Sequence, residues 1–441
     1  MAKVLLTGKY SAIEPLGLMY LAGALKEDNH EVNIHLLEDD YKIDFSKLVY
    51  YGKPDYVGFA AYTGFHKEIF EKANIVNNGS KTIAKTIIGG PHATFFADDC
   101  ILHAHYVVKG EGIQAIKDIC NGNANPGIVF NPKLVHPDDI PMPCRDTLYE
   151  DYRFRDNRIK SVMTSFGCPG NCCYCYNDSY RKLYGDNFKV RQRSVDLVIE
   201  ECLGLKKYPL DLIFFQDDCF GISPDWLSDF AAKYRDKVGV PFHCQLRPEV
   251  INDDRIELLK TAGCHGVTMA IESASEKVRR RYLNRKMSND QILDACRKIK
   301  EAGFRLRTEQ MLGLPGTTID DELELLRMNI RIQPDIAWVS MFTPYLGTTL
   351  GDWCKDRGLY NGTNDDLTGT FFSDSKLNFY PGRIAMTNML LRIFSTCAKM
   401  PHGDKLAQSC LRNGVSDMDG WFHAVKDHLY DSLLYNTRGI L

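Results

Sequence analysis

The stretch FGCPGNCCYCY, residues Phe166–Tyr176, decides how the rest of the chain is interpreted. Its cysteines Cys168, Cys172 and Cys175 have the spacing C-x3-C-x2-C. Three thiolates this close together on one glycine-containing loop can bind three irons of a [4Fe–4S] cubane and leave the fourth iron open. Structural zinc is the alternative, but it takes four ligands, usually in C-x2-C pairs, and no second pair or His-x3-His follows. The spacing therefore favours a cluster, and Cys173, between two ligands, is expected to be a small buried residue.

Composition and charge restrict the class of protein. The 441 residues carry 54 basic and 57 acidic side chains, a formal charge of −3, so no basic excess indicates nucleic acid or an anionic membrane as the partner. The N-terminal apolar run spans only Val4 to Leu6, and no run of about 18 apolar residues follows. We therefore expect a cytoplasmic protein without a membrane span. Fifteen cysteines, an odd number, then argue for a metal site and against a disulfide framework.

Strand and helix patterns alternate along residues 1–125. Short apolar strands are predicted at Lys3–Thr7, Glu31–Leu37, Asp55–Ala60, Lys85–Ile88 and Tyr106–Lys109, with helices such as Leu16–Lys26 between them. This alternation predicts a parallel, doubly wound sheet, in which ligands lie at the carboxyl ends of the strands. Glycine and small residues recur at these ends, where the backbone of a protein can approach a large ligand closely.

The same alternation resumes after a linker. Residues 126–160 contain five prolines and few apolar residues, and we expect extended chain there. From Ser161 the strand segments read VMTSF, LIFFQDD, PFHCQLR, GVTMAIES, FRLRTEQMLGLPG and IAWVSMFTP, with helical segments between them. Six such units predict a barrel or partial barrel over residues 161–354, with its site at the carboxyl ends of the strands. Residues 355–441 are predicted to be mainly helical.

The cysteine loop after the first barrel strand resembles that of the radical S-adenosylmethionine (SAM) superfamily. The resemblance implies that SAM binds the open iron through its amino and carboxylate groups, with Tyr174 beside the adenine. The alternative for Tyr174 is that it only packs within its loop. Further segments match the family in order, and the residues they assign to SAM or to catalysis are Gln216, Asp217 and Asp218 at the second strand, Glu272 and Ser273 in GVTMAIESAS, and Gly313 and Pro315 in MLGLPGT. Among these, Asp217 and Glu272 are the catalytic candidates; Thr317 replaces the family's usual glutamate.

The N-terminal region resembles the cobalamin-binding domain of B12-dependent radical SAM proteins. The matching pieces are EPLGLMYLA, VGFAAYT, GGPHAT and VVKGEG. The residues that the resemblance assigns to cobalamin are Pro15, Leu16, Gly17, Thr63, Gly89, Gly90, His92, Gly110, Glu111 and Gly112. The alternative is a flavodoxin-like domain that only packs against the barrel. The fragment GEGIQA also matches a dinucleotide G-x-G-x-x-A by letter, but it follows the last strand of the domain, whereas that fingerprint follows the first.

One departure from many B12 proteins concerns the lower cobalt ligand. The element D-x-H-x-x-G, which supplies a histidine to cobalt, is absent. Relatives that lack it cover the lower face with a residue of the loop after the third strand, which here is Tyr62 or a neighbour between Ala60 and Thr63. Tyr62 is therefore the third catalytic candidate. His66 and His92 are possible ligands, or histidines hydrogen-bonded within their loops. A weak lower ligand would favour cycling between Co(I) and methyl-Co(III).

The expected fold class is therefore α/β: a doubly wound Rossmann-like cobalamin-binding domain, a radical SAM partial TIM barrel and a mainly helical C-terminal region. The expected function is a cobalamin-dependent radical SAM C-methyltransferase that methylates an unactivated carbon of a peptide, a protein side chain or a small molecule. The resemblance implies a 5′-deoxyadenosyl radical, methylcobalamin and an electron donor such as ferredoxin or flavodoxin. Ring formation, rearrangement or oxidation without methyl transfer is one alternative. A non-catalytic cobalamin- or SAM-binding protein is the other, and the sequence does not name the substrate.

Overall fold

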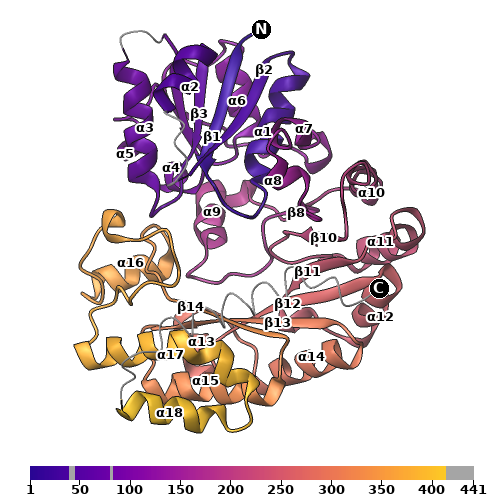
Figure 1. Ribbon diagram of the computed structural model, residues 1–441, viewed down its shortest axis with the longest axis vertical. Helices are drawn as coiled ribbons and strands as arrows, with labels where there is room; N and C mark the ends of the chain where they lie inside the picture. The colour runs from indigo at the N-terminus through magenta and orange to yellow at the C-terminus, as the bar shows by residue number, and fades with distance from the viewer. Residues whose placement is uncertain (39–44, 80–82, 414–441) are drawn as a thin grey trace. The chain divides into compact units, whose positions relative to one another are not determined.

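The computed structural model describes residues 1–38, 45–79 and 83–413, and these form two compact units (Figure 1). The first unit comprises residues 1–167, 179–210 and 363–369. The second comprises residues 168–178, 211–362 and the described residues from 370 onward. The cysteine loop therefore belongs to the second unit, whereas the region predicted to bind cobalamin belongs to the first.

A parallel sheet with strand order β2-β1-β3-β4-β5-β6 forms the centre of the first unit. Its strands are β1 (Lys3–Lys9), β2 (Glu31–Leu37), β3 (Tyr56–Ala60), β4 (Lys85–Gly89), β5 (Tyr106–Lys109) and β6 (Gly127–Phe130). The connecting helices are α1 (Leu16–Glu27), α2 (Phe45–Gly52), α3 (His66–Asn78), α4 (Pro91–Phe95), α5 (Ala97–Cys100) and α6 (Ile113–Cys120). The predicted doubly wound α/β fold is confirmed, and the five strands predicted from the sequence are present.

The sequence did not predict β6, which lies inside the proposed linker. It pairs with β5 from Tyr106–Gly127 to Lys109–Phe130, at the edge of the sheet. Half-buried and exposed residues alternate along it, so its apolar signal is weak beside the flanking prolines. Short elements follow: the 3-10 helix η1 (Pro137–Asp139), α7 (Arg145–Leu148), α8 (Tyr152–Arg155), β7 (Ile159–Val162), and the antiparallel pair β8 (Ser165–Phe166) and β9 (Arg191–Gln192).

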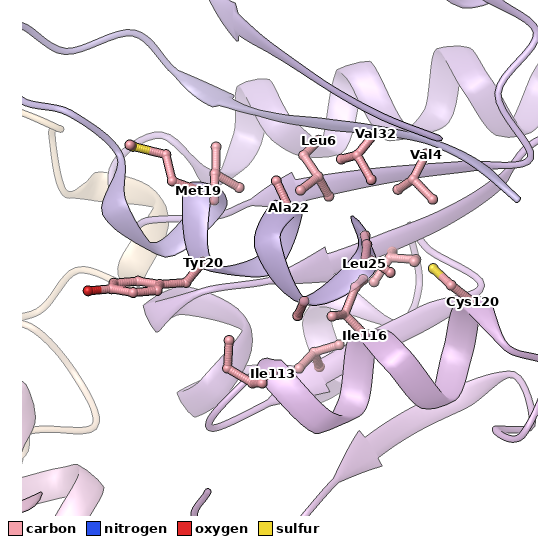
Figure 2. Close-up of a cluster of buried hydrophobic side chains, with 14 of the residues drawn as sticks. Val4, Leu6, Met19, Tyr20, Ala22, Leu25, Val32, Ile113, Ile116 and Cys120 are labelled. Atoms are coloured by element: carbon pink, nitrogen blue, oxygen red, sulfur yellow. The ribbon is translucent and has the colours of Figure 1, made fainter. Parts of the chain in front are cut away.

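Strand β1 is buried on both faces of the first sheet, as expected when helices cover both faces. Val4 and Leu6 point to one face and pack among residues of α1 and α6, as Figure 2 shows. Leu5 points to the other face and belongs to a second cluster that includes Val57 and Phe59. Because β1 is fixed from both sides, the loops that follow it and its neighbours have a rigid base.

The second unit contains a parallel sheet with the order β14-β13-β12-β11-β10. These strands are β10 (Leu212–Phe215), β11 (Phe242–Leu246), β12 (Cys264–Glu272), β13 (Arg305–Leu312) and β14 (Ile336–Met341). The helices between them are α11 (Pro224–Lys237), α12 (Asp253–Ala262), α13 (Glu276–Tyr282), α14 (Asn289–Glu301) and α15 (Ile319–Ile332), with η3 (Pro248–Val250) after β11. Five of the predicted barrel strands are thus present in order, and the arrangement is a partial barrel.

Helices dominate the remaining segments. Along the chain, the cysteine loop is followed by α9 (Tyr176–Tyr184), η2 (Gly185–Asn187) and α10 (Val195–Leu205). The C-terminal part contains α16 (Thr349–Asp356), η4 (Asn364–Asp366), α17 (Pro381–Lys399) and α18 (Gly403–Asn413), and α17 contacts both α15 and β14. The predicted helical C-terminal region is confirmed as far as Asn413; residues 414–441 lie outside the described part of the chain.

Candidate cofactor sites

The cysteine loop places three thiols in a shared, mostly buried environment. Cys168 is 8% and Cys172 7% exposed, and Cys175 is partly buried. Burial raises the pKa of the Cys168 thiol, and it raises that of Cys175 to about 12. Among the described residues, no set of three His, Cys, Asp or Glu side chains has the geometry to hold a single metal ion. In a cubane, each of the three thiolates would bind a different iron.

A buried arginine, Arg285, and a partly buried one, Arg247, lie against one of these thiols in the second unit. The Nη1 atom of Arg247 lies 3.1 Å from Cys172 Sγ, and the Nη1 atom of Arg285 lies 3.7 Å from it. Cys173, between the ligands, is partly buried and its thiol instead donates to the carbonyl of Tyr282 at 2.7 Å. The loop therefore separates the three candidate ligands from the fourth cysteine as the spacing predicts.

Tyr174 and Glu272 meet directly. The Tyr174 hydroxyl donates to Glu272 Oε1 at 2.6 Å, and Arg285 lies 3.4 Å from that hydroxyl and 3.9 Å from Glu272 Oε1. Burial raises the pKa of the Glu272 carboxyl, while the Arg285 cation opposes that shift. Burial, reinforced by Glu272, also raises the pKa of Tyr174 far above its ordinary value. The network holds the Tyr174 ring, which belongs to the cysteine loop, against Glu272 and Arg285. Its position beside the adenine of SAM stays a prediction.

The backbone at Glu272 is unusual. Its φ is +68°, and the pairing of β12 with β13 shifts register between Ala270 and Glu272, as at a β-bulge. Bulges often re-aim a side chain next to a site, and a positive φ at a residue other than glycine is uncommon. Ser273, which follows, is 3% exposed and its hydroxyl accepts from the backbone N–H of Ser275. Both residues are therefore held rigidly at the end of β12.

The polar residues after β10 have different environments. Asp217 is 0% exposed. Asp218 is solvent-accessible and accepts hydrogen bonds from Asn177 Nδ2 at 3.0 Å and from the Tyr176 hydroxyl at 3.2 Å. Gln216, which follows the last residue of β10 and precedes Asp217 in the chain, is half-buried. Asp218 thus ties the end of β10 to the start of α9, whereas the catalytic role predicted for Asp217 remains a prediction.

The loop after β13 is anchored by a buried ion pair. The backbone N–H of Gly313 donates to Glu322 Oε1 at 2.8 Å, and Arg383 of α17 donates to the same oxygen at 2.6 Å. Arg383 also reaches Thr317 Oγ1 at 3.2 Å. Burial raises the pKa of Glu322, and the Arg383 guanidinium offsets this. The C-terminal helix α17 therefore holds the Gly313–Thr317 loop, including Pro315, in place.

In the first unit, the residues predicted to bind cobalamin gather at the carboxyl edge of the sheet. Ala60 of β3 lies opposite Gly89 of β4, and the backbone N–H of Ala61 bonds to the Gly89 carbonyl at 2.8 Å. Gly90 follows with φ +96°, and an added Cβ there would lie 2.9 Å from the Ala61 carbonyl oxygen. Only glycine fits this position. The loops after β3 and β4 therefore lie against each other with little side-chain bulk.

The other predicted cobalamin contacts divide by environment. Gly17, near the start of α1, is exposed, and an added Cβ there would meet nothing within 4 Å. Pro15, Gly110 and Gly112 are half-buried, and Leu16 is buried in the core. The Glu111 carboxylate is used within the unit, because it accepts from the Val135 N–H at 2.7 Å and from Arg191 Nη2 at 2.5 Å.

Among residues Ala60–Thr63, Tyr62 is the one whose side chain is most open to solvent. It is 50% exposed, Ala61 is 0% exposed, and Thr63 Oγ1 is hydrogen-bonded to His92 Nδ1 at 2.9 Å. Desolvation by its surroundings raises the pKa of the Tyr62 phenol. Tyr62 is therefore the accessible side chain of this loop, and its contact with a corrin stays a prediction.

The two candidate histidine ligands are held within the first unit. Their rings stack on each other with centroids 4.1 Å apart, and they are 1% (His66) and 0% (His92) exposed. His66 accepts from the Gly64 N–H at 3.2 Å and pairs with Asp365 Oδ1 at 2.9 Å. Burial, with the His66 charge, lowers the pKa of His92 to about 3. This geometry favours the alternative of hydrogen-bonded loop histidines.

The family models agree with this division of the chain. The B12 binding domain matches residues 2–119, which include the edge just described. The radical SAM superfamily matches residues 162–328, which include the cysteine loop, Glu272 and Gly313.

Curated relatives carry both regions along most of their length. The chain is 29% identical over 374 residues to an uncharacterized methyltransferase of Pyrococcus horikoshii, covering 78% of this chain and 79% of the relative. It is 23% identical over 366 residues to the hopanoid C-3 methylase of Methylococcus capsulatus, covering 78% and 69%. Among solved structures, the radical SAM methyltransferase TsrM of Kitasatospora setae, determined with cobalamin and a [4Fe–4S] cluster, has a TM-score of 0.65 at 17% identity, covering 82% and 79%. This last likeness shows the shared fold.

The two matched domains and these relatives support a cobalamin-dependent radical SAM methyltransferase. Its cofactors are those of the family: SAM, a [4Fe–4S] cluster and cobalamin. The donor set fits the cluster, because each of the three clustered thiols lies beside an N–H donor. At the edge for cobalamin, the Thr7 hydroxyl of β1 is buried without a hydrogen-bond partner among the described residues. Together with the open surface at Gly17, this fits a ligand that supplies polar groups to the edge.

Sequence reasoning missed the arginines and one buried network of this methyltransferase. Glu14 Oε2 accepts from the Ser161 N–H at 2.6 Å and from Arg145 Nη1 at 3.3 Å, and Arg145 also donates to Glu201 at 2.6 Å. Glu14 directly precedes the predicted cobalamin residue Pro15. The sequence signal for Glu14 was its position in the EPLG piece. Arg145 and Glu201 lie far apart in sequence, and no sequence signal indicated them.

The described part of the chain contains no helix that is both long enough and apolar enough to span a membrane.

Proposed function

We propose that this enzyme methylates an unactivated carbon of a peptide, a protein side chain or a small molecule. The observation that carries the proposal is the presence of two complete cofactor regions on one chain, the cysteine loop at Cys168 and the small-residue edge at Gly89–Gly90. The methyltransferase names of two relatives support methyl transfer, whereas two other relatives are named cyclases and leave ring formation as the alternative. Bound together, the three cofactors supply one-electron chemistry and a transferable methyl group.

The chain's own residues hold these groups and control their surroundings. Cys168, Cys172 and Cys175 would bind the cluster, and Tyr174 with Glu272 would limit the space above the open iron. Glu272 is 8% exposed and bonded to Tyr174, so it offers a rigid, desolvated acceptor for a ligand's N–H or O–H groups. The first-unit edge at Gly17, Tyr62 and Gly90 would receive the corrin. An external one-electron donor such as a ferredoxin or flavodoxin is part of this proposal.

The test is mass spectrometry of anaerobic reactions with SAM carrying a deuterated methyl group. Reconstituted enzyme, a strong reductant and fractionated extracts of peptides and small molecules are combined, and a Cys168/Cys172/Cys175→Ala variant is the matched control. We expect a product in which one hydrogen on carbon is replaced by the deuterated methyl group, with S-adenosylhomocysteine and 5′-deoxyadenosine formed in equal amounts. A product that has only lost hydrogen, with 5′-deoxyadenosine but no S-adenosylhomocysteine, would instead establish ring formation or oxidation.

A further inference from the structure

The sulfur of Cys172 receives more positive charge than its two partners. Arg247 Nη1 lies 3.1 Å from it and Arg285 Nη1 lies 3.7 Å from it, and both guanidinium groups belong to the same unit. The Arg285 side chain is 3% and that of Arg247 15% exposed, so water screens these charges only weakly. Cys172 therefore lies in a field that favours negative charge on its sulfur.

The other two sulfurs have neutral donors. The backbone N–H of Gly170 donates to Cys168 Sγ at 3.3 Å, and Asn177 Nδ2 lies 3.7 Å from Cys175 Sγ. Each of the three candidate ligands thus has an N–H group beside it, and at Cys172 these groups belong to two guanidinium cations. The charge of Arg247 also acts on the Cys168 thiol, where it opposes the rise in pKa that burial causes.

The position of Arg247 depends on two further residues. Its Nη2 atom donates to Glu249 Oε1 at 2.6 Å, which holds the guanidinium from the side away from the thiol. A Cβ added to Gly170 would lie 2.3 Å from Arg247 Nη1 and 2.9 Å from its Cζ. Gly170 is therefore the space through which the guanidinium reaches Cys172, and any side chain there would push it away.

We propose that Arg247, admitted by Gly170 and assisted by Arg285, stabilises the reduced state of the cluster through Cys172. Reduction adds one electron, and hydrogen bonds to the ligand sulfurs and nearby charge set the potential of such clusters. A cation at 3.1 Å stabilises the more negative state more than the less negative one. The guanidinium thus raises the reduction potential and brings the cluster within reach of a biological one-electron donor. The inference rests on the cluster of the proposed function, but not on methyl transfer.

The test is an EPR-monitored redox titration of reconstituted protein without SAM or substrate. Arg247→Gln should lower the ratio of reduced to oxidised cluster at a fixed potential about tenfold, equivalent to a downward shift of about 59 mV for one electron. Gly170→Ala should lower the ratio in the same direction. Glu249→Gln, which leaves the cation but removes its counter-charge, should raise the ratio. Arg280→Gln is the control, because that side chain is 60% exposed and pairs with Glu276.

Two outcomes would overturn the proposal. One is an unchanged reduction potential of the cluster in Arg247→Gln together with weakened binding of SAM. Arg247 would then bind SAM and would not tune the cluster. The other outcome applies if Arg247→Gln fails to assemble a cluster. Glu249 has a partly exposed side chain that is easily replaced, so the Glu249→Gln variant can be measured in that case. An unchanged reduction potential of its cluster would then exclude the electrostatic effect. Neither outcome depends on whether the product is methylated, so failure of the proposed function is seen separately.

Discussion

The two cofactor regions of this enzyme are built in different ways. At the cobalamin edge of the first unit, the contacts predicted from the sequence are mainly backbone and small side chains, and the two nearby histidines are bonded within the protein. At the cysteine loop of the second unit, specific side chains point at specific sulfurs. We therefore expect the first region to select its ligand by shape and the second by bonds to defined atoms. Substitutions should therefore act by steric exclusion in the first and by loss of ligands or charge in the second.

Removal of the three cluster ligands should have the largest effect. It should abolish cluster binding in the second unit and leave cobalamin binding in the first unit unchanged. In the Cys168/Cys172/Cys175→Ala variant we expect no visible cluster absorption and no 5′-deoxyadenosine, because the three thiolates are the protein's only proposed bonds to iron. Cobalamin should still co-purify with the variant, since its edge uses none of these residues. Iron and sulfide analysis with ultraviolet–visible spectra measures both; a full cluster in the variant would contradict the assignment. Cys173→Ala, the control, should keep the cluster.

This difference also explains what the sequence could predict. The cysteine spacing, with Tyr174 inside it, and the strand-end positions of Glu272 and Gly313 were readable, because ligand residues and parallel strands leave local patterns. Glu272 and Gly313 do lie at the ends of β12 and β13, and Tyr174 meets Glu272 directly. Short β6 was missed because its pairing with β5 comes from tertiary structure, not from local apolar pattern.

Long-range charge pairing was the other missed element. Arg285 reaches Cys172 across 113 residues, and Arg145 reaches Glu14 across 131. A single sequence contains no periodicity that records such pairs. Arg247 was closer to prediction, since it follows β11 and strand ends carry the site residues of parallel sheets. That His92 binds the cofactor stays a prediction; in this structure its ring is 0% exposed, stacks on His66 and is hydrogen-bonded to Thr63.

The next prediction tests selection by shape at the cobalamin edge. Gly17→Ala should make the apoprotein slightly more stable, by up to about 1 kcal/mol, because alanine suits a helix and nothing in the protein meets the added methyl group. If the corrin approaches this backbone, cobalamin affinity should fall about tenfold, equivalent to about 1.4 kcal/mol. Thermal unfolding and equilibrium binding measure the two effects. Gly204→Ala in α10 is the matched control, with equally open space; equal cobalamin affinity in both variants would remove Gly17 from the site.

The buried histidine predicts a pH dependence confined to the first unit. The pKa of His92 is about 3 in the folded protein against about 6.5 when unfolded, so the unfolded state binds more protons between these values. Its contribution to stability is complete above pH 6.5 and is lost as the pH falls toward 3. At pH 5.5 the loss should be about 1.4 kcal/mol. Hydrogen exchange of β3 and β4 amides at pH 7.5 and 5.5, corrected for intrinsic rates, should show this loss; an equal loss in His92→Asn would assign it to another group.

The smallest effect should come from substitution of Tyr62. This substitution tests whether a side chain of the first region bonds directly to cobalt. Tyr62 is half exposed, and a phenol, whose ordinary pKa is about 10, stays protonated at neutral pH, which makes the oxygen a poor cobalt ligand. We therefore expect Tyr62→Phe to bind cobalamin as tightly as the wild type and to leave the Co(II) EPR spectrum unchanged. Tyr62→Ala should weaken binding about fivefold, equivalent to about 1 kcal/mol, through loss of the ring that packs against the corrin. A changed spectrum in the phenylalanine variant would show oxygen coordination, and the cobalamin edge would then resemble the cysteine loop in using a directed bond.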